Sequence, residues 1–226
     1  MTLNLLMLGP PGAGKGTQSE RFARSRGIPK ISTGDILREA VHAGTDIGRR
    51  AKVVMGRGEL VGDDVMIGIV RERLEKTDAM GGFVLDGFPR TVAQAEALDD
   101  IMSTRDPLIV VDIVVPEAEL VRRLGTRLIC DTCGAGAPVG ASSAAVTAVC
   151  VRCGGRLVQR ADDNQAVVLE RLKVYHRMSE PLVEYYRVRP TFRSIDGAQL
   201  PDRVAADLAA AIEAAGHGAV RHGVQR

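Results

Sequence analysis

The chain has 226 residues, of which 45% are hydrophobic and 26% charged, and its formal net charge is only +2. This composition predicts a folded protein with a sizeable core, either one large domain or a core that carries insertions. The near balance of charge argues against nucleic acid or an anionic membrane as a partner, and the scarcity of aromatic residues (four Phe, three Tyr and no Trp) argues against base stacking. The apolar run at the N-terminus stops at Pro10, too early for a signal peptide or a membrane span, so we expect a cytoplasmic protein.

Short apolar runs alternate with helical patterns along the chain, and we interpret the runs as buried strands at 3–8, 28–32, 83–85, 108–115 and 192–195. Strands that alternate with helices imply βαβ units with right-handed crossovers. The sequence therefore predicts an α/β fold, a doubly wound five-stranded parallel sheet. In such sheets a ligand binds beyond the carboxyl ends of the strands.

A glycine-rich segment, Gly-Pro-Pro-Gly-Ala-Gly-Lys-Gly-Thr at 9–17, follows the first predicted strand and leads into a helical pattern over 18–26. Glycines let backbone N–H groups approach a phosphate closely, the helix N-terminus adds its dipole, and Lys15 adds a mobile positive charge. We predict a phosphate-binding loop whose nucleotide contacts come from Gly12, Ala13, Gly14, Lys15, Gly16 and Thr17.

Two stretches interrupt the alternation. Residues 34–59 read as two short amphipathic helices, 35–42 and 45–55, and residues 127–161 lack periodicity and hold every cysteine. We expect both to be excursions from one core. Helical patterns follow over 164–178, 181–186 and 201–215, and we expect 217–226 to be a disordered tail.

The third predicted strand ends in Asp86, and a carboxylate at this place is the usual partner of a phosphate loop for hydrated Mg²⁺. The helix expected to follow would put Arg90 and Gln94 four residues apart on one face. A guanidinium and an amide so placed could hold a phosphate and the edge of a base.

The four cysteines form two Cys-x-x-Cys pairs separated by 16 residues, which is the spacing of a four-thiolate zinc site: Cys130, Cys133, Cys150 and Cys153. A glycine that follows each pair allows a tight turn beneath the metal. Disulfides are the alternative, but the cytoplasm is reducing. We predict a structural zinc, because four thiolates leave no open position for a substrate.

Several segments in order resemble adenylate kinase, from about residue 3 to 213. They are 9–17, Ser32-Thr33-Gly34-Asp35 with Leu37-Arg38, Leu85-Asp86-Gly87-Phe88-Pro89-Arg90-Thr91 with Gln94, Arg160 with Asp162-Asp163, and Tyr175-His176. The Asp-Gly-Phe-Pro-Arg segment is far more specific than the phosphate loop. The insertion with the cysteines resembles the long form of the family, whose lid carries zinc.

The resemblance implies a nucleoside monophosphate kinase that transfers the γ-phosphoryl group of Mg-ATP reversibly to AMP and gives two ADP. It implies catalytic roles for Lys15, Asp86, Arg90, Arg123, Arg127, Arg160 and Arg171, with AMP bound by Thr33, Arg38, Gly87, Arg90 and Gln94. It also implies a division into a phosphate-loop core (1–31, 62–123 and 162–216), a nucleoside-monophosphate-binding segment (32–61) and a lid (124–161).

Other functions remain open at this point. One is a UMP/CMP kinase or a GTP:AMP phosphotransferase, since spacing does not fix base selectivity. Another is a zinc-ribbon ATPase that binds nucleic acid through 127–161, although that stretch has few positive charges and no aromatic side chain. Nothing in the sequence suggests an obligate oligomer, so we expect a monomer that needs neither nucleic acid nor a membrane.

Overall fold

A parallel sheet forms the centre of the molecule in the computed structural model, which describes residues 2–137, 149–160 and 162–222. Its strand order is β2-β3-β1-β4-β7, and the strands are β1 (Leu3–Leu8), β2 (Lys30–Ser32), β3 (Gly82–Asp86), β4 (Leu108–Val114) and β7 (Phe192–Asp196). The predicted five-stranded parallel sheet is confirmed, and each strand overlaps its predicted range. The register puts Met7 opposite Asp86 and Leu8 opposite Asp112, so the ends of β1, β3 and β4 meet at one edge.

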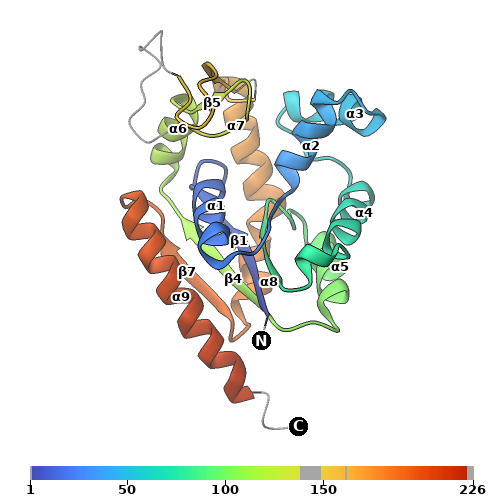
Figure 1. Cartoon of the computed structure of the whole chain (residues 1–226), viewed down its shortest axis with the longest axis vertical. Helices are drawn as coiled ribbons and strands as arrows, with labels where there is room; N and C mark the ends of the chain where they lie inside the picture. Colours follow the sequence, from blue (N-terminus) through green and yellow to red (C-terminus); the bar gives the residue numbers. More distant parts are fainter. Residues whose placement is uncertain (1, 138–148, 161, 223–226) are drawn as a thin grey trace.

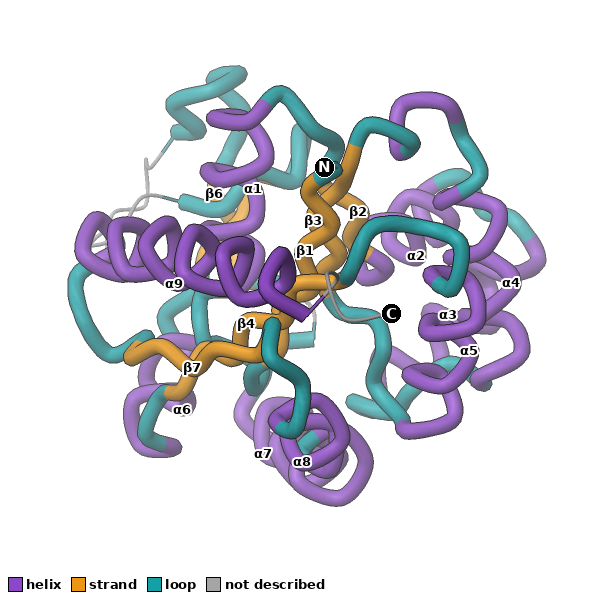
Figure 2. Tube along the Cα trace, turned by 90° about the horizontal axis from the view of Figure 1, so that it is seen from below, coloured by secondary structure: helices purple, strands orange, loops and turns teal. Residues whose placement is uncertain are grey.

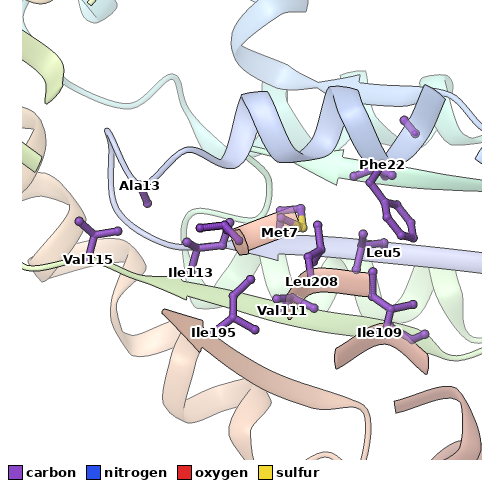
Figure 3. Close-up of a cluster of buried hydrophobic side chains, with 14 of the residues drawn as sticks. Leu5, Met7, Ala13, Phe22, Ile109, Val111, Ile113, Val115, Ile195 and Leu208 are labelled. Atoms are coloured by element: carbon purple, nitrogen blue, oxygen red, sulfur yellow. The ribbon is translucent and has the colours of Figure 1, made fainter. Parts of the chain in front are cut away.

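Helices cover both faces of this sheet (Figures 1 and 2). Along β1, Leu5 and Met7 belong to one buried cluster and Leu6 and Leu8 to the other. Figure 3 shows part of the first cluster, where Met7 and Leu5 lie near Leu208 and Phe22. Because both faces are buried, the strand is apolar along its whole length rather than alternating.

The helices divide between the two clusters. The first cluster takes side chains from α1 (Lys15–Arg26), α6 (Glu117–Gly125), α7 (Gln165–Val174) and α9 (Pro201–His222). The second takes them from α2 (Thr33–His42), α3 (Asp46–Gly56), α4 (Asp63–Leu74), α5 (Val92–Met102) and α8 (Pro181–Arg187), and a short 3₁₀ helix (Thr77–Ala79) precedes β3. The two short helices predicted after the second strand are confirmed as α2 and α3.

The structure differs from the sequence-based expectations in three places. The helical pattern over 164–178 divides into α7 and a π-helical turn, Tyr175–Ser179, that leads into α8. The cysteine-bearing stretch contains an antiparallel pair, β5 (Leu128–Cys130) and β6 (Leu157–Gln159), which its lack of periodicity did not predict. Helix α9 continues to His222, so the backbone of 217–222 is helical rather than a disordered tail; 223–226 lie outside the described residues.

Candidate active site

The loop between β1 and α1 has the shape that a phosphate site requires. Gly9, Gly12 and Gly14 have φ angles of 131°, 87° and 97°, a region that side-chain-bearing residues rarely adopt. At Gly9 a Cβ would lie 2.6 Å from the carbonyl oxygen of Ile113, so the close approach of the loop to β4 also requires glycine. Gly14 is the N-cap of α1 and supplies no side-chain oxygen, which leaves the first N–H groups of the helix available to an anion.

Lys15 reaches back across this loop. Its Nζ donates to the carbonyl oxygens of Gly9 at 2.6 Å and Pro10 at 2.9 Å. Burial lowers the pKa of Lys15 to about 8, and the nearby charge of Asp86 opposes that shift. The ammonium is thus held over the mouth of the loop, where phosphate oxygens can replace the two carbonyls.

The two strands that flank β1 each carry a buried carboxylate near this edge of the sheet. Asp86 is the last residue of β3 and is 8% exposed, and a Cβ on Gly16 would lie 3.6 Å from its Oδ2. Asp112 lies in β4, and its Oδ1 has no hydrogen-bond partner among the described residues. Burial raises the pKa of Asp112, and the positive charge of Lys15 opposes the shift. We did not predict Asp112 from the sequence, although a carboxylate inside the apolar run 108–115 was a usable signal.

A second group of polar side chains gathers where β2 and β3 end. The Thr33 hydroxyl donates to the carbonyl oxygen of Gly87 at 2.7 Å, and the Arg90 Nε–H donates to the same oxygen at 2.8 Å. Arg38 forms an ion pair with Asp35. Although burial raises the pKa of Asp35, the charges of Arg38 and Lys30 hold it at about 2.

The predicted helical pairing of Arg90 with Gln94 is wrong. Helix α5 begins at Val92 with Thr91 as its N-cap in an extended conformation, so Arg90 precedes the helix. The two residues meet in another way, because the backbone N–H of Arg90 donates to Gln94 Oε1 at 2.8 Å. The Gln94 Nε2 donates to Asp63 Oδ1 at 2.7 Å, and Asp63 is a partner that we did not predict.

Two adjacent carboxylates hold three of the arginines predicted to surround the phosphoryl group. Arg160 donates to both oxygens of Asp162 at 2.9 and 2.7 Å, Arg127 donates to both oxygens of Asp163, and Arg171 donates to Asp163 at 2.9 Å. Burial lowers the pKa of Arg171 to about 10, which leaves it cationic at neutral pH. Arg123 differs from these three, since it pairs with Glu119 inside α6 at 2.7 Å.

One cavity of about 2390 Å³ joins most of these groups. Its lining includes the phosphate loop from Gly12 to Thr17 and the following predicted site residues: Arg38, Asp86, Gly87, Arg90, Arg123, Arg127, Arg160 and Arg171. A smaller cavity of about 70 Å³ is lined by Thr33 and Gln94 and shares Arg38, Arg90, Arg160 and Arg171 with the large one. The predicted nucleotide-binding residues therefore line two cavities that share several side chains, and the volume of the larger one exceeds that of a typical site for one small ligand, about 300–1,000 Å³.

The four cysteines converge as the spacing predicts. Their Sγ atoms lie within 4.8 Å of one another, with Cys130–Cys153 at 3.5 Å and Cys133–Cys150 at 3.6 Å. These distances are too long for disulfides, whereas zinc bonds of about 2.3 Å would place the sulfurs of a tetrahedron about 3.8 Å apart. Gly134 and Gly154 have φ angles of 68° and 75°. Their backbone N–H groups donate to the carbonyl oxygens of Cys130 and Cys150, respectively. The cluster can hold a metal ion.

A phosphate loop at the carboxyl edge of a parallel sheet, facing a cavity rich in arginine, defines a phosphotransferase that acts on nucleotides. Comparison with known proteins specifies the family. A sequence model for adenylate kinase matches residues 7–191. The chain is 48% identical to the adenylate kinase of Archaeoglobus fulgidus over 93% of its length and 98% of the relative's. It is 51% identical to that of Moorella thermoacetica over 87% of this chain and 92% of the relative, and 49% identical to that of Geobacillus sp. over 91% and 96%.

The chain belongs to the adenylate kinase family. It is an enzyme, an ATP:AMP phosphotransferase, which transfers the γ-phosphoryl group of ATP reversibly to AMP and gives two ADP. The interpretations as a UMP/CMP kinase or a nucleic-acid-binding ATPase are not supported by these relatives. Among the helices of the described residues, none is long and apolar enough to cross a membrane.

Proposed function

We propose that the phosphate loop binds the phosphates of ATP as the donor nucleotide. Gly12, Ala13, Gly14, Gly16 and Thr17 would surround the phosphate chain with backbone N–H groups, and Lys15 would exchange its two carbonyl partners for β- and γ-phosphate oxygens. This role is supported by the open N-terminus of α1 and by the position of Lys15 over the loop.

We propose that AMP binds on the other side of the cavity. Arg38 and Arg90 would hold its phosphate, while Thr33, Gly87 and Gln94 would contact the nucleoside. Both arginines line both cavities, so they lie between the donor loop and the place proposed for the base. Residues 32–61, which include α2 and α3, would form the segment that encloses this nucleotide.

The chemistry requires positioning and charge neutralisation, because the phosphate of AMP is already an anion and needs no general base. Two arginines of the lid, Arg127 and Arg160, and two of the core, Arg123 and Arg171, would surround the phosphoryl group during its transfer and balance the charge on its oxygens. Closure of the lid, residues 124–161, would exclude water, which otherwise competes with AMP as the nucleophile.

Magnesium would enter with ATP, Asp86 would orient its water ligands, and Asp112 would supply a second carboxylate to the site. The site suits a hard cation, since it offers buried carboxylate oxygens and Asp112 Oδ1 has no partner among the described residues. When bound, Mg²⁺ would neutralise part of the charge on the phosphate oxygens.

We propose that the cysteine cluster binds a structural Zn²⁺. Four thiolates fill a tetrahedral shell, so the ion would have no open position for substrate. Strands β5 and β6 have only three residues each, and the sequence of the lid contains few large apolar residues, so the metal would supply much of the stability of the lid.

The convergence of Lys15, Asp86 and the arginines on one cavity carries these assignments, and replacement of Lys15 tests them. Lys15→Met should lower kcat by at least about 10²-fold, the range seen when one preorganised donor is removed from a transition state. Lys52→Met, on the exposed face of α3, is the matched control and should leave kcat unchanged. Retained activity in Lys15→Met would contradict the donor-site assignment.

The assay should measure ADP formation from ATP with AMP, CMP, UMP or GMP as the acceptor, and ATP hydrolysis without an acceptor. We expect fast ADP formation only with AMP. We also propose that the enzyme acts as a cytoplasmic monomer that needs neither nucleic acid nor a membrane. ATP hydrolysis that needs no acceptor and is stimulated by RNA or DNA would contradict the proposed independence from nucleic acid. Sedimentation of the purified protein tests the monomer directly.

A further inference from the structure

Gln94, the residue proposed to contact the acceptor base, is held at both ends of its amide. Its side chain is 1% exposed overall, yet it lines the smaller cavity. Its Oε1 accepts from the backbone N–H of Arg90 at 2.8 Å, and its Nε2 donates to Asp63 Oδ1 at 2.7 Å. Asp63 comes from another part of the chain, the first turn of α4.

These two partners permit only one orientation of the amide. A backbone N–H can only donate, so the atom of Gln94 that faces Arg90 must be the oxygen. An ionised carboxylate can only accept, so the atom that faces Asp63 must be the nitrogen. A flipped amide would place oxygen against carboxylate and N–H against N–H, and both contacts would be repulsive.

Asp63 is itself held in place on its other oxygen. The Thr91 hydroxyl donates to Asp63 Oδ2 at 2.9 Å, and the same hydroxyl accepts from the backbone N–H of Gln94 at 3.2 Å. Thr91 is 6% exposed and is the N-cap of α5, so the network joins the starts of α4 and α5. Within the described part of the chain, one N–H of Gln94 Nε2 and one lone pair of Oε1 remain free for a ligand.

We propose that Asp63 is a positioning residue that fixes the orientation of the Gln94 amide and thereby selects adenine over hypoxanthine in the acceptor nucleotide. Adenine presents its N6 donor next to a ring-nitrogen acceptor, a pattern that matches an amide oxygen beside an amide N–H. Hypoxanthine has an acceptor, O6, in place of that donor. It therefore meets the oriented amide with a mismatch, whereas an amide free to flip can accommodate either base. This inference rests on the proposed contact between Gln94 and the base.

The test compares kcat/KM for AMP and for IMP at saturating Mg-ATP. Asp63→Asn keeps the shape of the side chain but can no longer accept from both Thr91 and Gln94. The preference for AMP over IMP should fall about tenfold, because KM for AMP rises and KM for IMP falls, while kcat with AMP changes little. Asp64→Asn is the matched control: it removes a charge from the same first turn of α4 at an exposed position, and should leave the preference unchanged.

Two further variants separate the possible failures. Gln94→Ala should also reduce the preference, and in that background Asp63→Asn should change it by less than about twofold, because the two residues act as one unit. If Gln94→Ala reduces the preference and Asp63→Asn does not, this inference is overturned and the proposed acceptor site stands. If Gln94→Ala retains the full preference for AMP, both this inference and the proposed contact between Gln94 and the base are overturned. Should Asp63→Asn not fold, Asp63→Ala in the same comparison gives the same decision.

Discussion

Arg127 and Asp163 are joined at two points: the Nε–H and an Nη2–H of Arg127 donate to the two carboxylate oxygens of Asp163, both at 2.6 Å. The side chain of Asp163 is 0% exposed. Its Oδ1 also accepts from Arg171 at 2.9 Å. Arg127 lies at the start of the cysteine-bearing stretch and Arg171 lies in α7, after that stretch. One buried carboxylate therefore fixes two proposed phosphate-binding arginines from different parts of the chain.

Replacement of Asp163 by asparagine should therefore weaken the ion pairs of both Arg127 and Arg171. Breaking a buried ion pair by removal of one partner typically costs about 3–5 kcal/mol, and asparagine retains part of the hydrogen bonding, so we expect a loss in the lower part of that range. The guanidinium groups would also lose their orientation toward the cavity, and kcat/KM for ATP should fall about 10²-fold. Thermal unfolding and initial rates of ADP formation measure the two effects.

The control for Asp163 is an exposed ion pair of similar length. Asp202 accepts from Arg21 at 2.5 Å, but the two side chains are 88% and 53% exposed. Asp202→Asn should change stability by less than about 1 kcal/mol and leave kcat/KM unchanged. Equal effects of the two substitutions would show that burial of the Asp163 carboxylate does not decide its role.

Burial lowers the pKa of Lys15 to about 8, and this pKa should set the pH above which kcat/KM for ATP falls. Above pH 8 the ammonium loses its charge, so kcat/KM for ATP should decline, because this ratio reports the free enzyme. Bound phosphates raise the pKa of the same group, so kcat should stay level to higher pH. Profiles of kcat/KM and of kcat between pH 6 and 10.5 test this. If both parameters fall at the same pH, the role of Lys15 is contradicted.

The same shift has a consequence for stability. The folded protein releases the Lys15 proton at lower pH than the unfolded chain, whose lysine has a pKa near 10.5. Between pH 8 and 10.5 the unfolded state therefore binds more protons, and this group makes the protein more stable as the pH rises. Lys15→Met removes the cost of the buried charge, so it should raise the free energy of unfolding at pH 7 while it abolishes activity.

Asp112 should be destabilising in the absence of ligands. Burial raises its pKa above the unfolded value of 3.8, so the folded state binds the proton more tightly and stability falls as the pH rises through the raised pKa. Asp112→Asn should raise the free energy of unfolding at pH 7 by about 1 kcal/mol and have little effect at pH 3. The substitution should also move the alkaline fall of kcat/KM to lower pH, because the charge of Asp112 is one of those that raise the pKa of Lys15. A variant less stable at pH 7 would contradict this account.

The sheet and the donor side of the site were predictable because their signals are local. A strand buried on both faces is a continuous apolar run, and parallel strands bring their carboxyl ends to one edge, which placed the phosphate loop beside Asp86. The convergence of the cysteines likewise followed from their spacing. Such patterns need no knowledge of how distant elements pack.

The contacts that orient the site were not predictable in the same way. Asp63 meets Thr91 and Gln94 across 28 and 31 residues, and no periodicity links those positions. The sequence did contain a signal against placing Arg90 in the helix with Gln94. Thr91-x-x-Gln94 fits the sequence of a capping box, which places the start of the helix after Thr91. The contact differs from a standard capping box, because Gln94 Oε1 accepts from the backbone N–H of Arg90, one residue before the N-cap, and not from that of Thr91.

Removal of the proposed zinc should separate stability from catalysis. Cys130→Ser deletes one of four thiolates whose sulfurs lie within 4.8 Å, and a structural zinc contributes on the order of 10–16 kcal/mol of apparent binding energy. The lid should then unfold at a lower temperature, whereas turnover at low temperature should fall much less, because the proposed phosphate-binding arginines are held by Asp162 and Asp163 rather than by the cluster. Metal content, melting temperature and ADP formation at 15 °C are measured on the same samples, with chelator-treated wild-type protein expected to match the variant. Proportional loss of melting temperature and turnover would indicate that the cluster serves the reaction itself.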